Sequence, residues 1–143
     1  MQRDQNYVVY LVKYRLETAA EDLKAATVLF ESNVLKAANN RAYYSIFHSI
    51  QAIHAMDGKE YRKHKDAIGN FNKEYVKTGI FSRDLGRRIS AAEDVRHASD
   101  YDDFYIVSRE ITTDQIKTAE DLLEQVKVYC KKRQYGLISR ARQ

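Results

Sequence analysis

Apolar residues recur at steps of three and four through most of this chain, and this spacing limits its fold more than any other feature. Two series show it clearly: Val12, Leu16, Ala19, Leu23, Ala26 and Phe30, and later Ile116, Ala119, Leu123, Val126 and Cys130. Such spacing places the apolar side chains on one face of an α-helix. No proline interrupts the series, and no alternating pattern is long enough to support a β-sheet. The sequence therefore predicts an all-helical protein.

The breaks between the series divide the chain into about five helices. Three predicted helices cover about residues 8–31, 34–57 and 64–75. A fourth runs from about residue 83 into the polar cluster that begins at Asp94, and a last one follows Thr112 and includes the series from Ile116 to Cys130. Ser32 and Asn33 supply a break and a cap before the second helix, and Gly58 ends it. Ser82 is the predicted cap of the fourth helix, and Thr112 with Gln115 forms a capping box for the last. Residues 100–108 are expected to be an irregular connection.

The second helix is apolar on almost every side, so we expect it to be the central one. A small-residue face comprises Ala38, Ala42, Ser45, Ser49, Ala52 and Met56, and a second face comprises Tyr43, Ile46, Ile50 and Ile53. A third stripe is polar and consists of Arg41, Tyr44, His48 and Gln51. An unpaired buried polar atom costs about 1–3 kcal/mol, so these groups need partners. They either pair across a dimer, line a cleft, or bond to a neighbouring helix as ordinary core groups.

The end of the fourth helix carries the densest group of chemically useful side chains. Arg96, His97, Asp100 and Tyr101 fall within about one and a half helical turns. Arginine is a permanent planar cation suited to phosphate, histidine exchanges protons near neutral pH, and tyrosine offers a hydroxyl and a stacking face. The structural alternative is that Arg96 pairs only with Asp100, and His97 only with Glu93, four residues apart.

Length and composition indicate one cytoplasmic domain. The 143 residues suit a single core, here assigned to residues 1–134 with a basic and flexible tail at 135–143. The net charge is +4, but the last thirteen residues hold five basic residues and no acid, so the remainder is nearly neutral. The tail either touches RNA or is a solvated helix end. No signal peptide or membrane span is recognisable, and contact with a membrane is not expected.

Other features of the sequence point to neither a metal nor a cofactor. No set of histidines and acids has the ligand spacing of a metalloprotease or a di-iron bundle, so we predict no metal and no cofactor.

Cys130 lies on an apolar stripe and is expected to be a buried, inert thiol. A basic group around the first loop either binds phosphate or is simply solvated. This group consists of Lys59, Arg62, Lys63, His64 and Lys65.

Three stretches together resemble the HEPN family, the nucleotide-binding domains of higher eukaryotes and prokaryotes, and in particular its small stand-alone prokaryotic members. They are residues 40–48, residues 63–86 with KHK, Phe71, YVKTGIF and Leu85-Gly86, and residues 95–102 with Val95-Arg96 and Asp100-Tyr101-Asp102. The resemblance covers most of the chain. It implies an up-and-down helical bundle that forms a homodimer, in which the arginine motifs of two protomers face one shared cleft.

The resemblance also implies a choice between two functions. Many HEPN proteins are metal-independent RNA endonucleases, often toxins of toxin–antitoxin pairs, whose motif is an arginine followed after four to six residues by a histidine. Arg96 fits the first position, but Tyr101 stands where four intervening residues place the histidine. RNA cleavage by its own 2′-hydroxyl needs a base, an acid and a cation for the phosphorane. His97 or His48 would then move the protons.

The candidate site residues fall into a binding group and a catalytic group. Arg41 and Tyr44 are candidates, with Arg96, for binding phosphate or a nucleotide, and Arg96, His97, Tyr101 and His48 are the candidate catalytic residues. The alternative function is a non-catalytic nucleotide-binding or partner-binding module. Such a module would work with a small nucleotidyltransferase acting as antitoxin, and Tyr101 would be a target for modification.

Overall fold

The computed structural model describes the backbone of residues 5–142 and the side chains of residues 5–136. Its helices are α1 (Gln5–Glu31), α2 (Leu35–Met56), α3 (His64–Phe71), α4 (Arg83–Tyr101) and α5 (Arg109–Arg142). One π-helical turn, η1 (Asn72–Val76), continues α3 directly. The described chain contains no strand, so the predicted all-α fold with five helices is confirmed. None of its helices has the length and apolarity needed to span a membrane.

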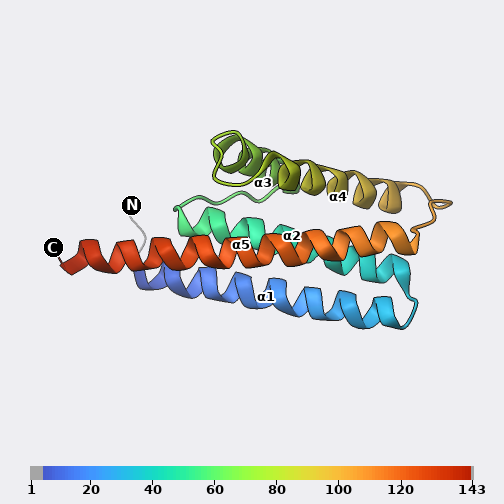
Figure 1. Ribbon diagram of the computed structural model, residues 1–143, viewed down its shortest axis with the longest axis horizontal. Coiled ribbons are helices and arrows are strands. Elements are labelled where there is room, and N and C mark those ends of the chain that lie inside the picture. Colours follow the sequence, from blue (N-terminus) through green and yellow to red (C-terminus); the bar gives the residue numbers. More distant parts are fainter. Residues whose placement is uncertain (1–4, 143) are drawn as a thin grey trace.

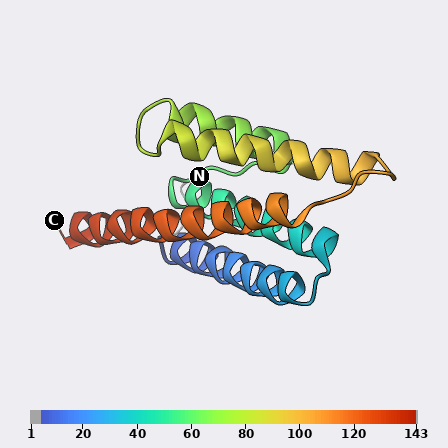
Figure 2. The same ribbon diagram turned by 45° about the vertical axis from the view of Figure 1, so that its right-hand side comes forward.

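The helices form an up-and-down bundle with α2 in its middle. In Figure 1, α1, α2 and α5 lie side by side, and the pair formed by α3 and α4 lies across the other side of α2. Figure 2 shows the same arrangement from a second direction. α2 packs against α1, α3, α4 and α5, and most of its residues are buried. The prediction of a central second helix is therefore confirmed.

Of the two predicted caps that involve a hydroxyl, the one before α4 is present and the one before α5 is not. The Oγ of Ser82 accepts a hydrogen bond from the N–H of Leu85 at 3.1 Å, as predicted for the start of α4. The capping box at Thr112 is wrong, because α5 begins one turn earlier. There the Oγ of Ser108 accepts from the N–H of Ile111 at 3.0 Å.

Asn33 does not cap α2, although its type predicted a cap. Its φ of 61° places it in the left-handed region, where asparagine is tolerated, and α2 has no side-chain cap. Its Oδ1 instead accepts a hydrogen bond from Nη1 of Arg109 at 2.9 Å. The Arg109 guanidinium also lies 4.3 Å from the centroid of the Phe30 ring. These contacts connect the end of α1 to the first residue of α5.

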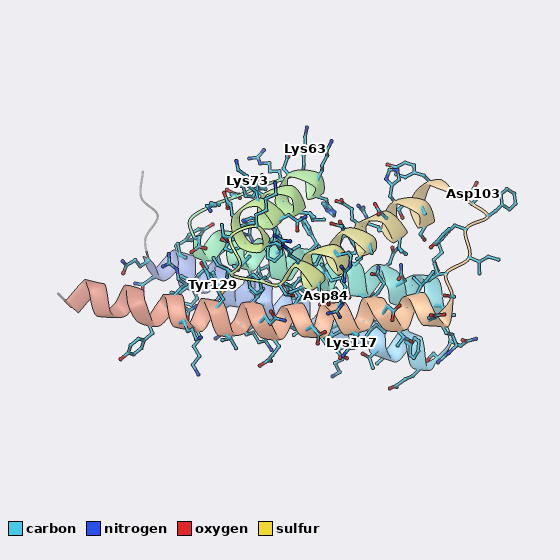
Figure 3. All side chains as sticks on the ribbon, turned by 45° about the horizontal axis from the view of Figure 1, so that its top comes forward. Lys63, Lys73, Asp84, Asp103, Lys117 and Tyr129 are labelled. Atoms are coloured by element: carbon cyan, nitrogen blue, oxygen red, sulfur yellow. The ribbon has the colours of Figure 1, made fainter. Side chains whose placement is uncertain are left out.

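Asp57, directly after α2, holds three elements together at the other end. Its Oδ2 accepts from the hydroxyls of Tyr75 at 2.5 Å and Tyr129 at 2.7 Å, and its Oδ1 from Nε of Arg133 at 3.2 Å. Tyr129 is labelled on α5 in Figure 3. α5 continues past residue 134 to Arg142, so the backbone of the predicted tail is helical as far as it is described. Residues 1–4 and 143 lie outside the described residues.

Candidate functional site

Arg96 lies where α4 crosses α2 and the start of α3. Its Nη1 is 3.3 Å from Nδ1 of His64, and its guanidinium carbon lies 5.0 Å from the centroid of the Tyr43 ring and 5.7 Å from that of Tyr44. Its Nε is 3.4 Å from a carboxylate oxygen of Asp100. Burial opposes the charge, but the two tyrosines and Asp100 outweigh it and raise the pKa of Arg96. The side chain of Arg96 is 28% exposed, so it lies at the edge of the packed bundle rather than inside it.

His64 is held in one tautomer by its neighbours. A guanidinium can only donate, so Nδ1 of His64 is the acceptor, and its single lone pair is shared between Nη1 of Arg96 and, at 3.0 Å, the hydroxyl of Tyr43. The proton of the neutral ring is therefore on Nε2. Burial, with help from Arg96 and His48, lowers the pKa of His64, and burial raises that of Tyr43 to about 12. Both groups thus stay neutral near pH 7, with the hydroxyl able to donate.

A second histidine, His48, is held by a buried carboxylate of α1. Its Nδ1 is 3.0 Å from Oδ2 of Asp22, whose Oδ1 is 3.2 Å from Nη1 of Arg41. A carboxylate oxygen accepts, so Nδ1 of His48 donates to it, and in the neutral ring Nε2 then holds the lone pair. The exposed fraction of the side chain rises from 10% for Asp22 to 31% for His48 and 55% for Arg41. The ring of His48 therefore connects a buried anion to the surface.

Two aromatic rings join these groups into one site. The Tyr44 ring lies 6.3 Å from the His48 ring and 6.0 Å from the His64 ring, centroid to centroid. The Phe47 ring stacks on His64 at 3.8 Å with an angle of 17° between the planes. In Figure 3, Lys63 marks the start of α3, directly before His64. The site thus runs along the polar stripe of α2 and is completed by Asp22, His64 and Arg96.

Of the six candidate site residues predicted from the sequence, the structure brings four together and places the other two on a different face of α4. Arg41, Tyr44 and His48 of α2 form one connected group with Arg96 of α4, linked through Asp22 and the Tyr44 ring. His97 is exposed, and its ring lies 4.5 Å from that of Tyr101, which is 79% exposed. Consecutive helical residues point about 100° apart, so Arg96 and His97 face different directions within one chain.

Sequence reasoning missed two members of the site. The sequence places His64 only in the basic group around the first loop, although the stretch containing KHK carries part of the family resemblance. Asp22 occupies the apolar series of the first helix, between Ala19 and Ala26, and is only 7% exposed. A charged residue at such a position was the signal that could have found it, because buried carboxylates need partners.

Other possible sites are less informative. Within the part of the chain whose side chains are described, no group of three or more histidines, cysteines, aspartates or glutamates is arranged to hold a metal ion. Cys130 is buried as predicted, and burial raises its pKa to about 12. It lines a pocket of about 340 Å³ between α1 and α5, away from Arg96.

The fold and the arginine site define a helical domain of the HEPN type, and comparison with known proteins supports the same assignment. The model of the HEPN domain family matches residues 12–129, which is most of the chain. The protein therefore belongs to the HEPN family.

Several relatives are similar over most of the domain. A "UPF0332 protein" of Thermotoga maritima is 30% identical over 116 residues, covering 81% of this chain and 88% of the relative. "Putative toxin MJ0605" of Methanocaldococcus jannaschii is 36% identical over 86 residues, covering 60% of this chain and 64% of the relative. The crystal structure of an archaeal HEPN homologue superposes with a TM-score of 0.65 at 16% identity, covering 91% and 99% of the two chains. At that identity it supports the fold alone.

Proposed function

We propose that this HEPN protein is a toxin of a toxin–antitoxin pair that cleaves RNA without a metal ion. The observation that carries the proposal is the placement of the Arg96 guanidinium beside His64 and Tyr44. The Tyr44 ring in turn lies beside His48, a histidine whose Nδ1 is bound by a carboxylate. The name of the Methanocaldococcus relative supports the toxin role. The family resemblance supports a homodimer in which two such sites share a cleft.

The proposed reaction uses the 2′-hydroxyl of the RNA as nucleophile. Arg96 binds the non-bridging oxygens of the phosphate and stabilises the charge of the phosphorane. Nε2 of His48 takes the proton of the 2′-hydroxyl as the bond from O2′ to phosphorus forms. The bond from phosphorus to O5′ breaks, and the leaving oxygen takes a proton from solvent. The products are a 2′,3′-cyclic phosphate and a 5′-hydroxyl.

Arg96→Ala tests this proposal against a matched control on the same helix. The side chain of Arg87 is 76% exposed and pairs with Asp84 along the surface of α4, so Arg87→Ala removes an equal charge away from the site. We expect Arg96→Ala to lower cleavage of a labelled single-stranded RNA by at least ~100-fold, and Arg87→Ala to change it little. Cleavage should persist in chelator. Full cleavage and RNA binding by Arg96→Ala would refute the site.

Two further variants separate the candidate proton carriers. His48→Ala should lower the cleavage rate by about 10²–10⁴-fold, the usual contribution of a positioned base. His97→Ala should have little effect, because its ring lies on the exposed side of α4 against Tyr101. The reverse result would make His97 the proton carrier and would remove His48 from the proposed mechanism.

The homodimer has its own test. Sedimentation at micromolar concentration should give a species of twice the chain mass of 16.7 kDa, held by an interface that buries at least about 1,000 Å². A clean monomer under these conditions would contradict the shared cleft.

The second candidate function is partner binding regulated by nucleotidylation. Tyr101 is 79% exposed, so its hydroxyl is open to a modifying enzyme. A partner nucleotidyltransferase would move a nucleoside monophosphate from a nucleoside triphosphate to this oxygen, and pyrophosphate would leave. Mass spectrometry after co-expression with a nucleotidyltransferase encoded beside the gene tests this. The adduct should disappear in Tyr101→Phe, and an adduct on another residue would contradict the assignment.

A further inference from the structure

Asp22 occupies a position where the packing of α1 against α2 would favour an apolar residue. It lies between Ala19 and Ala26, both fully buried, and is itself 7% exposed. A buried carboxylate is costly unless its oxygens are paired. Each oxygen of Asp22 has one partner on α2, namely Nη1 of Arg41 and Nδ1 of His48. The two partners are seven residues apart, so one carboxylate fixes both across two helical turns.

We propose that Asp22 is a positioning residue that orients His48 as the base of the site. The proposal rests on the RNA cleavage proposed above and adds a residue that does not contact the substrate. Through Oδ2, Asp22 selects the tautomer with the proton on Nδ1 and leaves the lone pair on Nε2. Arg41, bound to the other oxygen, fixes the orientation of the carboxylate.

The other three histidines do not offer the same arrangement. Nδ1 of His64 already accepts from Arg96 and Tyr43, and its Nε2 carries the proton. His54 is fully buried, and its Nε2 is 2.8 Å from the carbonyl oxygen of Ala67, to which it must donate. His97 lies on the exposed face of α4. Only His48 combines a free Nε2 lone pair, partial exposure and contact through Tyr44 with the Arg96 site.

Asp22→Asn tests the proposal with little change of shape. The amide keeps the size of the carboxylate, but it can either accept from Nδ1 or donate to it, so it no longer selects one tautomer. Glu21→Gln, at the exposed neighbouring position of α1, is the matched control for the loss of one negative charge. Circular dichroism and urea unfolding would verify that both variants fold.

The first measurement is the ¹⁵N chemical shift of the two ring nitrogens of His48. In the wild type and in Glu21→Gln, Nδ1 should be the protonated nitrogen, and in Asp22→Asn the signals should move toward those of the other tautomer. The second measurement is cleavage of a labelled single-stranded RNA. Asp22→Asn should lower kcat by at least ~100-fold with KM changed less than about threefold, whereas Glu21→Gln should resemble the wild type.

The outcomes separate this proposal from the function on which it rests. If the wild type cleaves RNA and Asp22→Asn keeps its kcat or its His48 tautomer, Asp22 is a structural residue and the proposal is overturned. If the wild type does not cleave RNA, the proposed function fails, and the catalytic role of Asp22 fails with it even where the ring shifts show the pair. Loss of kcat together with the tautomer change in Asp22→Asn supports both the ribonuclease function and the positioning role of Asp22. Should Asp22→Asn fail to fold, Asp22→Ser provides a second test, because a hydroxyl can also either accept from Nδ1 or donate to it. Unchanged kcat and an unchanged His48 tautomer in that variant would overturn the proposal.

Discussion

Replacing Gly86 by alanine should destabilise the protein, although alanine is the better helix former. Gly86 lies inside α4 near its start, where the helix passes close to η1. A Cβ at this position would lie 2.8 and 3.1 Å from the two methyl carbons of Val76 and 3.3 Å from Oδ1 of Asn72. Valine is stiff at χ1, so these methyl groups cannot simply turn away.

The magnitude follows from two opposing contributions. Alanine gains about 1 kcal/mol over glycine in a helix interior, whereas forcing an extra methyl group into a packed contact costs typically about 1–3 kcal/mol. We therefore expect Gly86→Ala to lower the free energy of unfolding by about 1 kcal/mol. Gly69→Ala in α3 is the matched control, because a Cβ there meets nothing within 4 Å. It should raise the free energy of unfolding by up to about 1 kcal/mol.

Urea unfolding monitored by circular dichroism measures both changes directly. In a double-mutant cycle, Gly86→Ala should cost less free energy of unfolding in the Val76→Ala background than in the wild type, because the shortened side chain no longer meets the new Cβ. If Gly86→Ala stabilises the protein as much as Gly69→Ala does, the close approach of α4 to η1 is not a packing constraint. The reasoning about how α4, and with it Arg96, is held would then be wrong.

Three further predictions concern the rest of the chain. Asp57→Ala should lower the free energy of unfolding by about 2 kcal/mol in urea titrations, because it removes the carboxylate that accepts from the hydroxyls of Tyr75 and Tyr129 and leaves Tyr75 only the 3.4 Å contact with the carbonyl oxygen of Ile53. A loss below about 0.5 kcal/mol would contradict this role. Burial lowers the pKa of His54 from its ordinary 6.5, so the unfolded chain takes the proton first as the pH falls. The contribution of His54 to stability should therefore be complete above pH ~6.5 and decrease below it, and His54→Gln should flatten that decrease. Greater stability at pH 5.5 than at pH 7.5 would contradict the sign. Cys130, 1% exposed with a pKa raised by burial to about 12, should resist iodoacetamide at pH 8 until the protein is unfolded, and rapid labelling of the native state would refute its burial.

The helices could be predicted from the sequence because the apolar period is local, and the start of α5 could not because its cause is distant. Thr112 and Gln115 match a capping box, but Ser108 offers the same hydroxyl chemistry one turn earlier. The additional turn is held by Arg109, which contacts Asn33 and the Phe30 ring at the end of α1. No pattern within the last helix contains that information.

The candidate site, too, could be predicted only where its residues are close together in the sequence. Arg96 was found from the residues around it, and the polar stripe of α2 from its spacing. His64 joins them from 32 residues away, through the packing of α3 and α4 on α2. Asp22 comes from 26 residues before His48. The direction of His97 could have been predicted, because a residue adjacent to Arg96 on a helix cannot point into the same contact.

The hydroxyl of Tyr101 separates the two candidate functions. In the proposed ribonuclease, Nε2 of His48 takes the proton, and the Tyr101 ring lies against His97 on the exposed side of α4. Tyr101→Phe keeps that ring contact and removes only the hydroxyl, so RNA cleavage should stay within about twofold of the wild type, a change of about 0.4 kcal/mol in the barrier. In the partner-binding function the same oxygen receives the nucleotide, so nucleotidylation should be abolished. A loss of cleavage above ~100-fold in Tyr101→Phe, with the fold intact, would instead place this hydroxyl in the reaction, reaching the cleft from the partner protomer, and would refute His48 as the sole proton carrier.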